Sequence, residues 1–490
     1  MGRQAALIGL IAASLAFYGW WNPPYLALIG ASVIVNFAFG LTLLKARSKI
    51  ILAIAVIFNL GLLGYYKYAG FFADIANDLF GTQIETGSII LPLAISFFTF
   101  QQIAYQVDVY EGKIRSKNFA HYSLFVCFFP QLIAGPIVHH REVTPQFEDA
   151  RAFRLTAQNI LAGSVLFTIG LFKKVVVADG LDPYADALFD APVLQPTLID
   201  AWAGTLAYGF QIYFDFSAYT DMAMGLARFF NIRLPLNFFS PYKAVNIIDF
   251  WRRWHITLSR FLRDYLYIPL GGNRKGKLRR YLNLLITMLL GGLWHGASWT
   301  FIAWGALHGF YLAINHAWRS VRRSLKIGPA QPTTLSRGVA RLVTFIAVMI
   351  AWTFFRADSF SDAFAVIVGM AGLNGLILPQ ALADAMGGAP FGLTAGVTIL
   401  GDPVLYVWLA VLLIAVWCAP NTQEITAMWQ PSLEPENEDF RQALKAPQLE
   451  HPATKRLNWL LPSAITLGLA CLLITAYRGG KTAEFIYFAF

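Results

Sequence analysis

The sequence predicts an all-α polytopic membrane protein with about 10–12 transmembrane helices, plus re-entrant and interfacial helices. Hydrophobic residues make up 57% of the 490 residues and charged residues only 13%, about half of the share that is usual in a soluble domain. Apolar runs of about 20 residues recur along the whole chain, as a hydrocarbon core about 30 Å thick requires of a spanning helix. These runs are continuous and do not alternate in polarity, which argues against an outer-membrane barrel.

The candidate spans follow one another from the first residues to the last. The first is interpreted as a retained helix and not a signal peptide, because it lacks a convincing cleavage site and another span follows at once. A run over 361–377 is weaker than the others. The candidate spans cover approximately residues 5–21, 25–44, 50–66, 88–105, 156–172, 200–228, 282–298, 300–316, 340–355, 402–418 and 459–477.

Basic segments between the spans predict the orientation, because Lys and Arg concentrate in cytoplasmic loops. They also account for the net charge of +10, which therefore indicates membrane topology and not binding to nucleic acid. The three cysteines lie far apart in apolar stretches, so neither a metal site nor a disulfide framework is expected. The segments placed in the cytoplasm are 45–49, 113–117, 252–280 and 319–341.

The chain is predicted to form a single membrane-embedded unit over 1–490. N-terminal helices (1–110) and C-terminal helices (357–490) flank a central core (121–356). An aromatic turn at 20–24 and the segment 378–401, which has no Lys or Arg, are placed outside. The polar stretch 422–458 is placed in the cytoplasm.

Residues 121–138 are apolar, but both flanking regions favour the cytoplasm. They contain "FFPQLIAGPI", in which Pro130, Gly135 and Pro136 break a helix. Irregular backbone at membrane depth is tolerated only where protein or water satisfies its polar groups. We therefore interpret this stretch as a re-entrant segment that lines a cavity; a proline-kinked span is the alternative.

His295 lies within "MLLGGLWHGASWTFIAWGALHG" at 288–309, a run long enough to cross a membrane. Ionisable residues at this depth are costly and usually functional. Arg280 marks the inner interface, so fifteen residues of helix place His295 about 22 Å from it. Nearby glycines are expected to leave room for a path to the imidazole, with Trp294 and Trp299 as walls. The alternative is a core histidine that is hydrogen-bonded between helices.

The densest polar region, 237–280, predicts an amphipathic helix at the inner interface. Most of its basic side chains fit a membrane-surface helix with snorkelling arginines. A concentrated basic face would also attract an anionic substrate such as a phosphorylated cofactor. His255 is predicted to lie inside this helix. The candidate donor-binding residues are Arg252, Arg253, Arg260 and Arg263.

A second polar group lies in "YFDFSAYTDMAMG" at 213–225. Asp215 and Asp221 do not share a helical face, and buried acids need partners. We therefore favour structural pairing, with the cationic helix downstream as the expected partner, over a paired-carboxylate catalytic site. His308 is expected to bond across helices, with the lining of a shared cavity as the alternative. The candidates for the substrate path are Trp294, Asp215, Tyr219, Asp221, Gln131 and His308.

The usual nucleophile and nucleotide motifs are absent from the sequence. There is no G-x-S-x-G, no P-loop and no H-E-x-x-H. A base without a protein nucleophile suits transfer between two bound substrates, where an imidazole deprotonates an incoming hydroxyl.

The motifs together resemble the membrane-bound O-acyltransferase family, in its bacterial branch that includes the alginate O-acetylation and teichoic-acid D-alanylation membrane subunits. The resemblance covers residue 128 to the end and is closer to the alginate-type members, which normally open with one more apolar segment. The matching stretches are "FFPQLIAGPI" (128–137), "DFSAYTDMAMGLA" (215–227), "PLNFFSPY" (235–242), "FWRRWHITLSRFLRDYLYIPLGGNR" (250–274), "LGGLWHGASWTFIAWGALHG" (290–309), "FFRAD" (354–358), "PNTQEI" (420–425) and "FIYFAF" (485–490).

The resemblance implies a central funnel through the protein, with His295 as the essential residue and His255 as its helper. It implies a cytoplasmic acyl donor, acetyl-coenzyme A or another acyl carrier, and no resident cofactor or metal. It also implies an exported polysaccharide such as alginate as final acceptor, an extracytoplasmic acetyltransferase partner, and a place among the lipids of the bacterial inner membrane. His295 is either a general base or a transient acyl acceptor. The rival interpretations are a proton-coupled solute transporter and a polysaccharide-export scaffold.

Overall fold

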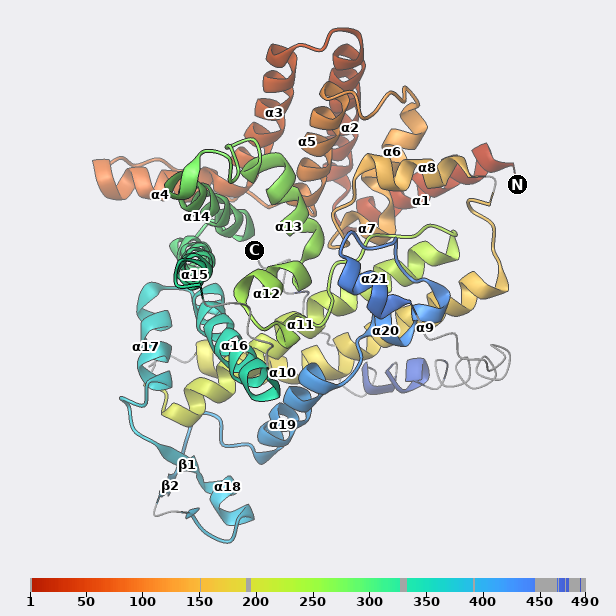
Figure 1. Ribbon diagram of the computed structural model, residues 1–490. Helices are drawn as coiled ribbons and strands as arrows, with labels where there is room; N and C mark the ends of the chain where they lie inside the picture. Colours follow the sequence, from red (N-terminus) through yellow and green to blue (C-terminus); the bar gives the residue numbers. More distant parts are fainter. Residues whose placement is uncertain are drawn as a thin grey trace.

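The computed structural model describes residues 2–149, 151–190, 195–326, 333–390, 393–445 and a few residues between 465 and 485. Helices account for almost all of its regular structure (Figure 1), as the sequence predicts. Five of the described helices are long and apolar enough to cross a membrane, so the chain is a multi-pass membrane protein. The predicted span 459–477 and loop residues 446–458 lie largely outside the described residues.

The N-terminal helices match the first predicted spans. They are α1 (Arg3–Trp21), α2 (Pro23–Lys45), α3 (Lys49–Leu63), a π-helix (Gly64–Tyr68), α4 (Ala69–Phe80) and α5 (Ile95–Tyr110). Pro23 begins α2, where a missing N–H costs nothing, and the Ser48 hydroxyl caps α3. Figure 1 shows α2, α3 and α5 side by side at one end of the molecule.

The prediction of helix from residue 88 is wrong for residues 88–94. This stretch is not helical, and α5 begins only at Ile95. Pro92 has no N–H for a helical bond, and Ala94 adopts a left-handed conformation with φ of 63°. The chain therefore reaches α5 as an irregular segment, which becomes important at the site.

The predicted break in residues 121–138 is present. The backbone forms α6 (Phe119–Cys127), a short α7 (Phe129–Leu132) and an irregular stretch before α8 (His140–Glu148). Phe128 leaves the helical region with ψ of 106°, and Pro130 lies in the first turn of α7, where its missing N–H costs nothing. The residues of this segment are almost all buried in protein, as irregular backbone within a membrane protein requires.

The central helices carry most of the candidate residues. They are α9 (Ala157–Phe172), a π-helix (Lys173–Ala178), α10 (Asp179–Phe189), α11 (Leu198–Phe229), α12 (Ile247–Arg253), α13 (Ile256–Leu262) and a π-helix (Arg263–Tyr267). The single amphipathic helix predicted around His255 is wrong. Two short helices meet there instead, because Trp254 is extended and His255 is left-handed with φ of 41°.

The remaining helices complete the fold. They are α14 (Gly276–His295), α15 (Trp299–Ser324), α16 (Thr334–Arg356), α17 (Phe360–Met370), α18 (Gln380–Ala385), α19 (Pro403–Cys418), α20 (Thr422–Ile425) and α21 (Glu438–Leu444). The segment 378–401, which is predicted to lie outside, contains α18 and most of a small sheet in which β1 (Ile377–Pro379) and β2 (Thr394–Gly396) pair in parallel. These strands and α18 project at the end opposite α3 (Figure 1).

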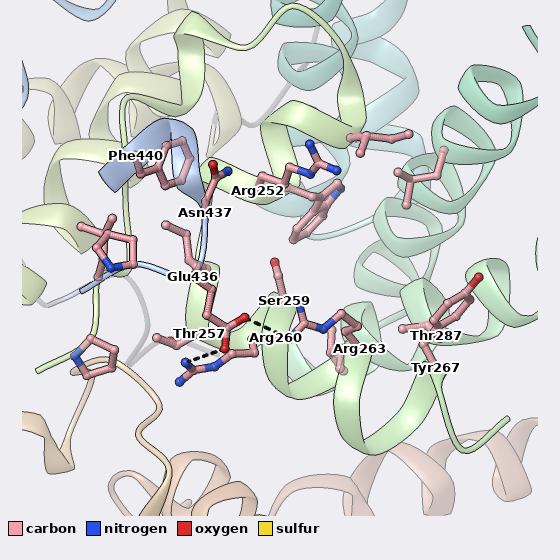
Figure 2. A pocket seen from close by; sticks show the side chains of 18 of the residues that line it. Arg252, Thr257, Ser259, Arg260, Arg263, Tyr267, Thr287, Glu436, Asn437 and Phe440 are labelled. Atoms are coloured by element: carbon pink, nitrogen blue, oxygen red, sulfur yellow. Dashed lines mark hydrogen bonds and ion pairs between the residues drawn. The ribbon is translucent and has the colours of Figure 1, made fainter. Parts of the chain in front are cut away.

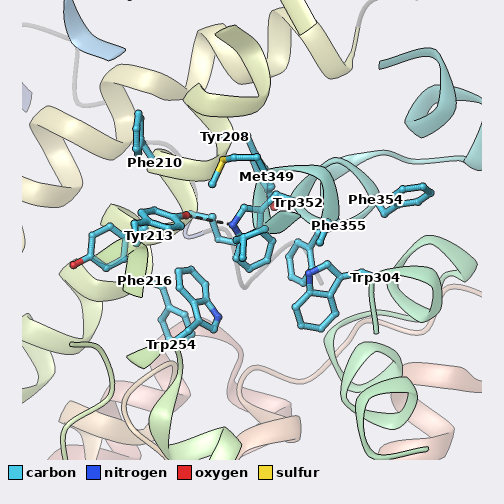
Figure 3. Close-up of a cluster of buried hydrophobic side chains, with 14 of the residues drawn as sticks. Tyr208, Phe210, Tyr213, Phe216, Trp254, Trp304, Met349, Trp352, Phe354 and Phe355 are labelled. Atoms are coloured by element: carbon cyan, nitrogen blue, oxygen red, sulfur yellow. Dashed lines mark hydrogen bonds between the residues drawn. The ribbon is translucent and has the colours of Figure 1, made fainter. Parts of the chain in front are cut away.

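Aromatic side chains fill the centre of the molecule. Trp254, Trp304 and Trp352 are all nearly inaccessible to solvent, and they bring α11, α12, α15 and α16 together (Figure 3). The ring centres of Trp254 and Trp352 are 4.9 Å apart, and those of Trp352 and Trp304 are 5.9 Å apart. The first pair is tilted and the second stacked, and aromatic pairs that are offset from a face-to-face arrangement add stabilisation to that of buried area.

Of the glycines expected to make room for a path, Gly292 and Gly296 instead serve close packing, whereas a Cβ on Gly291 would meet only the end of the Leu262 side chain, at 3.3 Å. A Cβ atom on Gly292 would lie 2.2 Å from the Phe301 carbonyl oxygen, and one on Gly296 would lie 2.1 Å from the Phe301 ring. On the facing helix, a Cβ on Gly305 would lie 2.3 Å from the Met288 carbonyl oxygen. The two backbones therefore touch along this seam, as at other interfaces built from small residues within membranes.

Candidate active site

His295 is the last residue of α14, which is unbroken from Gly276 and therefore carries the imidazole about 22 Å beyond Arg280. Its exposed fraction is only 3%. Aromatic rings surround it, with the Trp304 and Phe355 ring centres at 5.1 and 5.0 Å. The helix ends here because Gly296 is extended, with φ of −161°. His295 is thus held at a helix end by a rigid aromatic wall.

A cavity of about 330 Å³ reaches His295 from the side of the first helical hairpin. Trp294 and the irregular residues before α5 form much of its wall. Because the turn at Trp21 is assigned to the outside by the basic loops, we name this space the outer cavity. Trp299, predicted as a wall, is instead half-exposed and packs against Phe71. Lining residues include Trp21, Lys67, Ile90, Ile133, Trp294 and His295.

Lys67 is a site residue that the sequence reasoning missed. Its Nζ atom donates hydrogen bonds to the carbonyl oxygens of Trp294 at 2.7 Å and His295 at 2.9 Å. The neighbouring Tyr68 hydroxyl donates to the Leu293 carbonyl oxygen at 2.8 Å. The signal was a single lysine in the apolar run "GLLGYYKYAGFF", since an intramembrane charge is by default a functional candidate.

A second, larger cavity of about 710 Å³ lies beside α12 and α13 (Figure 2). We name it the inner cavity, because its walls belong to the basic segments predicted to be cytoplasmic. Three of the four predicted arginines line it, namely Arg252, Arg260 and Arg263. Arg253 does not line it; this guanidinium bonds Asp249 at 2.8 Å and stacks over the Phe440 ring.

Carboxylates neutralise part of the predicted basic face. Arg260 is paired with both oxygens of Glu142, at 2.5 and 2.8 Å. Arg263 binds Asp264, which raises the pKa of the guanidinium further, and it also contacts Glu436 at 3.3 Å. Among the residues that the structure describes, Arg252 has no ion-pair partner and is exposed. Arg252 is therefore the lining arginine best placed to meet an anion.

His255 lies between the two cavities and not at the inner face, where prediction placed it. The residue is fully buried, and its ring centre is 6.1 Å from that of Trp294. Its Nδ1 atom lies 3.1 Å from Asn237 Oδ1. That oxygen also accepts from the Thr257 hydroxyl at 2.8 Å, and Thr257 lines the inner cavity. His255 thus joins the inner wall to the Trp294–His295 pair.

The acidic residues of α11 form ion pairs, as the sequence predicts. Their partners, however, do not belong to the cationic segment downstream. Lys174 Nζ lies 2.8 Å from Asp215, and Lys173 Nζ lies 2.7 Å from Asp221. Thr422 also donates to Asp221 at 2.7 Å. Both lysines belong to the π-helix after α9. They take part in a buried network of ion pairs with the acids of α11 and do not form part of a cytoplasmic basic loop.

The other path candidates are not brought to either cavity. Gln131 donates to the Phe125 carbonyl oxygen inside its own segment, although Ile133 of the same segment lines the outer cavity. Tyr219 packs on Phe485. His308 bonds across helices as expected, because Trp251 Nε1 donates to its Nδ1 at 3.2 Å. In the described part of the chain, no group of three or more His, Cys, Asp or Glu could hold a metal ion.

Comparison with known proteins identifies related chains. A model of the membrane-bound O-acyltransferase family matches residues 110–355. A peptidoglycan O-acetyltransferase of Helicobacter pylori is 48% identical over 75% of this chain and 74% of its own. A probable alginate O-acetylase AlgI of Azotobacter vinelandii is 43% identical over 74% and 72%. A teichoic acid D-alanyltransferase of Streptococcus thermophilus is 28% identical over 55% and 69%.

Proposed function

Because this chain belongs to the membrane-bound O-acyltransferase family, we propose that it moves an acetyl group from a cytoplasmic thioester to a hydroxyl on the other side of the membrane. The chain is an acyltransferase, as its family and relatives show. The acetyl group, the polysaccharide acceptor, the sidedness and the reacting residue are what we propose. The observation that carries it is the position of His295 on the wall of the outer cavity, one residue from Trp294. The family of the chain does not support the two rival interpretations, a proton-coupled solute transporter and a polysaccharide-export scaffold.

The inner cavity is the proposed donor site. Its volume of about 710 Å³ lies within the range of pockets that bind small molecules. Arg252 offers a guanidinium for a phosphate, and Ser259 adds a hydroxyl group. Acetyl-coenzyme A, an anionic thioester with phosphates at the end remote from the acetyl group, fits this arrangement. Another acyl carrier with a phosphate group would fit the same contacts.

His295 is proposed to react in one of two ways. As a general base, its imidazole removes the proton from the acceptor hydroxyl while the oxygen attacks the acetyl carbonyl. As a transient acceptor, the imidazole first takes the acetyl group and then passes it on. Its aromatic surroundings keep water from competing with the acceptor.

The acceptor and the setting form part of the proposal. We propose an exported polysaccharide in the bacterial inner membrane, reached with the help of an extracytoplasmic acetyltransferase partner. The related proteins are named for peptidoglycan and for alginate, so the proposal stops at a hydroxyl-bearing glycan. Exposed apolar side chains on the helices, such as Ile57 and Ile414, would face membrane lipid.

The test uses the full chain in proteoliposomes with acetyl-coenzyme A labelled in the acetyl group. His295→Ala is expected to lower transfer to an oligosaccharide acceptor by about 10²–10⁴-fold, the usual contribution of a general base. His121→Gln, which removes another buried histidine that lines neither cavity, is the matched control and should keep wild-type transfer. Label bound to the protein without acceptor would favour the transient-acceptor route. Wild-type transfer by His295→Ala would overturn the assignment.

A further inference from the structure

We infer that Lys67 is a further residue of the transfer reaction, which holds the backbone at His295 and stabilises the negative oxygen that forms on the acyl group. The inference rests on the proposed function. Three observations carry it: the hydrogen bonds of the ammonium group, its position on the outer cavity, and the π-helix that places it there.

The ammonium group of Lys67 caps the end of α14. The last carbonyl groups of a helix have no partner within it and carry a partial negative charge, so a cation there is favourable. Lys67 bonds the Trp294 and His295 carbonyl oxygens, and Tyr68 bonds that of Leu293. Three consecutive carbonyl groups are thus fixed by two adjacent side chains, and the backbone that carries the imidazole is held with them.

Capping the end of α14 does not use all the N–H donors of the Lys67 ammonium group. An ammonium has three N–H donors, and the two carbonyl oxygens of α14 are its acceptors among the described residues. Lys67 lines the outer cavity together with His295, and is only partly buried. One N–H donor of the Lys67 ammonium group is therefore left for a molecule that occupies the outer cavity beside His295.

A π-helix places Lys67 in this position. The continuous helix from Lys49 to Phe80 contains a π-helical turn at Gly64–Tyr68, and such turns occur frequently at functional sites. A lysine within a candidate membrane span is costly to bury. A neutral side chain such as glutamine could donate to the same two carbonyl groups at a lower cost of burial. The positive charge of Lys67 therefore points to a negative charge that develops beside it during the reaction.

The proposed step accounts for every proton and electron pair. The acceptor oxygen forms a bond to the acetyl carbonyl carbon, its proton passes to His295, and the carbonyl π electrons move to oxygen. The Lys67 ammonium donates to this oxyanion, as preorganised donors do in other acyl transfers. The oxyanion then reforms the carbonyl, the carbon–sulfur bond breaks, and the leaving thiolate takes the proton from the imidazolium.

The test compares Lys67→Met with Lys67→Arg in proteoliposomes and measures kcat, the KM for acceptor and equilibrium binding of acetyl-coenzyme A. Lys67→Met is expected to lower kcat by about 10²–10³-fold, the cost of losing one oxyanion donor, with unchanged donor binding. Lys67→Arg, which keeps the charge, should recover part of kcat. Tyr68→Phe is the matched control: it removes a cap from the same helix end but no charge at the cavity, and its kcat should fall much less.

The outcomes separate this inference from the proposed function. An inactive wild-type protein would contradict the proposed function itself. With an active wild type, a wild-type kcat in Lys67→Met would overturn the inference. A fall in kcat of the same size in Tyr68→Phe as in Lys67→Met would overturn it too, as would a loss of donor binding in Lys67→Met as large as its loss of kcat. Either of these last two results would show that Lys67 has a purely structural role. If Lys67→Met does not fold, Lys67→Gln against Lys67→Arg makes the same comparison, since glutamine keeps N–H donors without charge.

Discussion

His255 has a backbone conformation that few residues other than glycine adopt. With φ of 41° and ψ of 55°, it turns the chain between α12 and α13. Strained residues of this kind persist where the surroundings over-determine them, and they cluster at functional sites. Here the imidazole is held by Asn237 on one side and by the rings of Phe216 and Trp294 on the others. The strain directs this side chain toward the neighbourhood of His295.

His255→Ala is therefore expected to lower kcat, by about 10²-fold, and less than His295→Ala does, since it assists the reacting histidine. The KM for donor should change little, because His255 does not line the inner cavity. Initial rates at varied acetyl-coenzyme A measure both constants. His140→Gln, a second buried histidine in an aromatic environment, serves as the control. A change confined to KM would return His255 to the donor-handling role predicted from the sequence.

At the scale of elements, π-helices place cations at the outer cavity, at the buried acids of α11 and at the inner cavity. Gly64–Tyr68 brings Lys67 to α14, Lys173–Ala178 brings two lysines to the acids of α11, and Arg263–Tyr267 begins with an arginine of the inner cavity. Each inserts one residue per turn into an otherwise regular helix and so rotates the side chains that follow. A regular helix through the same residues would present these side chains on different faces.

The α14–α15 seam gives a prediction for stability. Gly292→Ala should lower the free energy of unfolding by about 1–3 kcal/mol, the usual cost of overpacking, because its Cβ would meet the backbone of Phe301 and not a movable side chain. Thermal unfolding in detergent measures the change. Gly61→Ala, in a helix where a Cβ would meet nothing within 4 Å, should be neutral or stabilising. Equal unfolding temperatures for Gly292→Ala and wild type would contradict the close packing.

The pair of adjacent arginines on α12 provides a matched test of donor binding. Arg252→Gln should raise the KM for acetyl-coenzyme A by about tenfold at low ionic strength, and by less at high salt, because exposed charges are screened over about 8–10 Å. Arg253→Gln should leave KM nearly unchanged, since Arg253 does not line the cavity and its guanidinium is held by Asp249 and the Phe440 ring. Equal effects of the two substitutions would show that Arg252 has only the snorkelling role.

At the scale of the whole molecule, the inner and outer cavities are separate among the described residues, in place of the single continuous cavity that the sequence predicts. Phe261 stacks on Phe100 at 4.1 Å, and Phe100 stacks on Trp294 at 5.3 Å. This row of rings runs from α13, beside the inner cavity, to the wall of the outer cavity.

The two cavities predict a sided reaction. Acetyl-coenzyme A supplied to the face that carries α12 and α21 should support transfer to an acceptor on the opposite face, while the reversed arrangement should not. Proteoliposomes of known orientation, with donor inside or outside, measure this directly. Permeabilised vesicles, in which both faces meet both substrates, provide the control. Equal transfer in both intact arrangements would contradict the assignment of the cavities.

The sequence alone determined most of the helices and singled out His295 as the candidate for the reaction. Long apolar runs predicted α1, α2, α3, α9, α11, α14, α15, α16 and α19 to within a few residues in most cases, because burial in lipid requires uninterrupted apolar helices. It also indicated the break near Pro130, since proline lacks an N–H. His295 stood out because a polar group in such a run is costly.

Only the tertiary structure decided which polar groups meet. Lys67 and His295 lie 228 residues apart in sequence, and a hydrogen bond of 2.9 Å joins the lysine to the histidine backbone. The lysine partners of Asp215 and Asp221 likewise belong to another helix. Local periodicity contains no information on such pairs, because they depend on how helices pack and where π-helical turns rotate a face. The same packing turned Gly292 from an expected opening into a contact with α15.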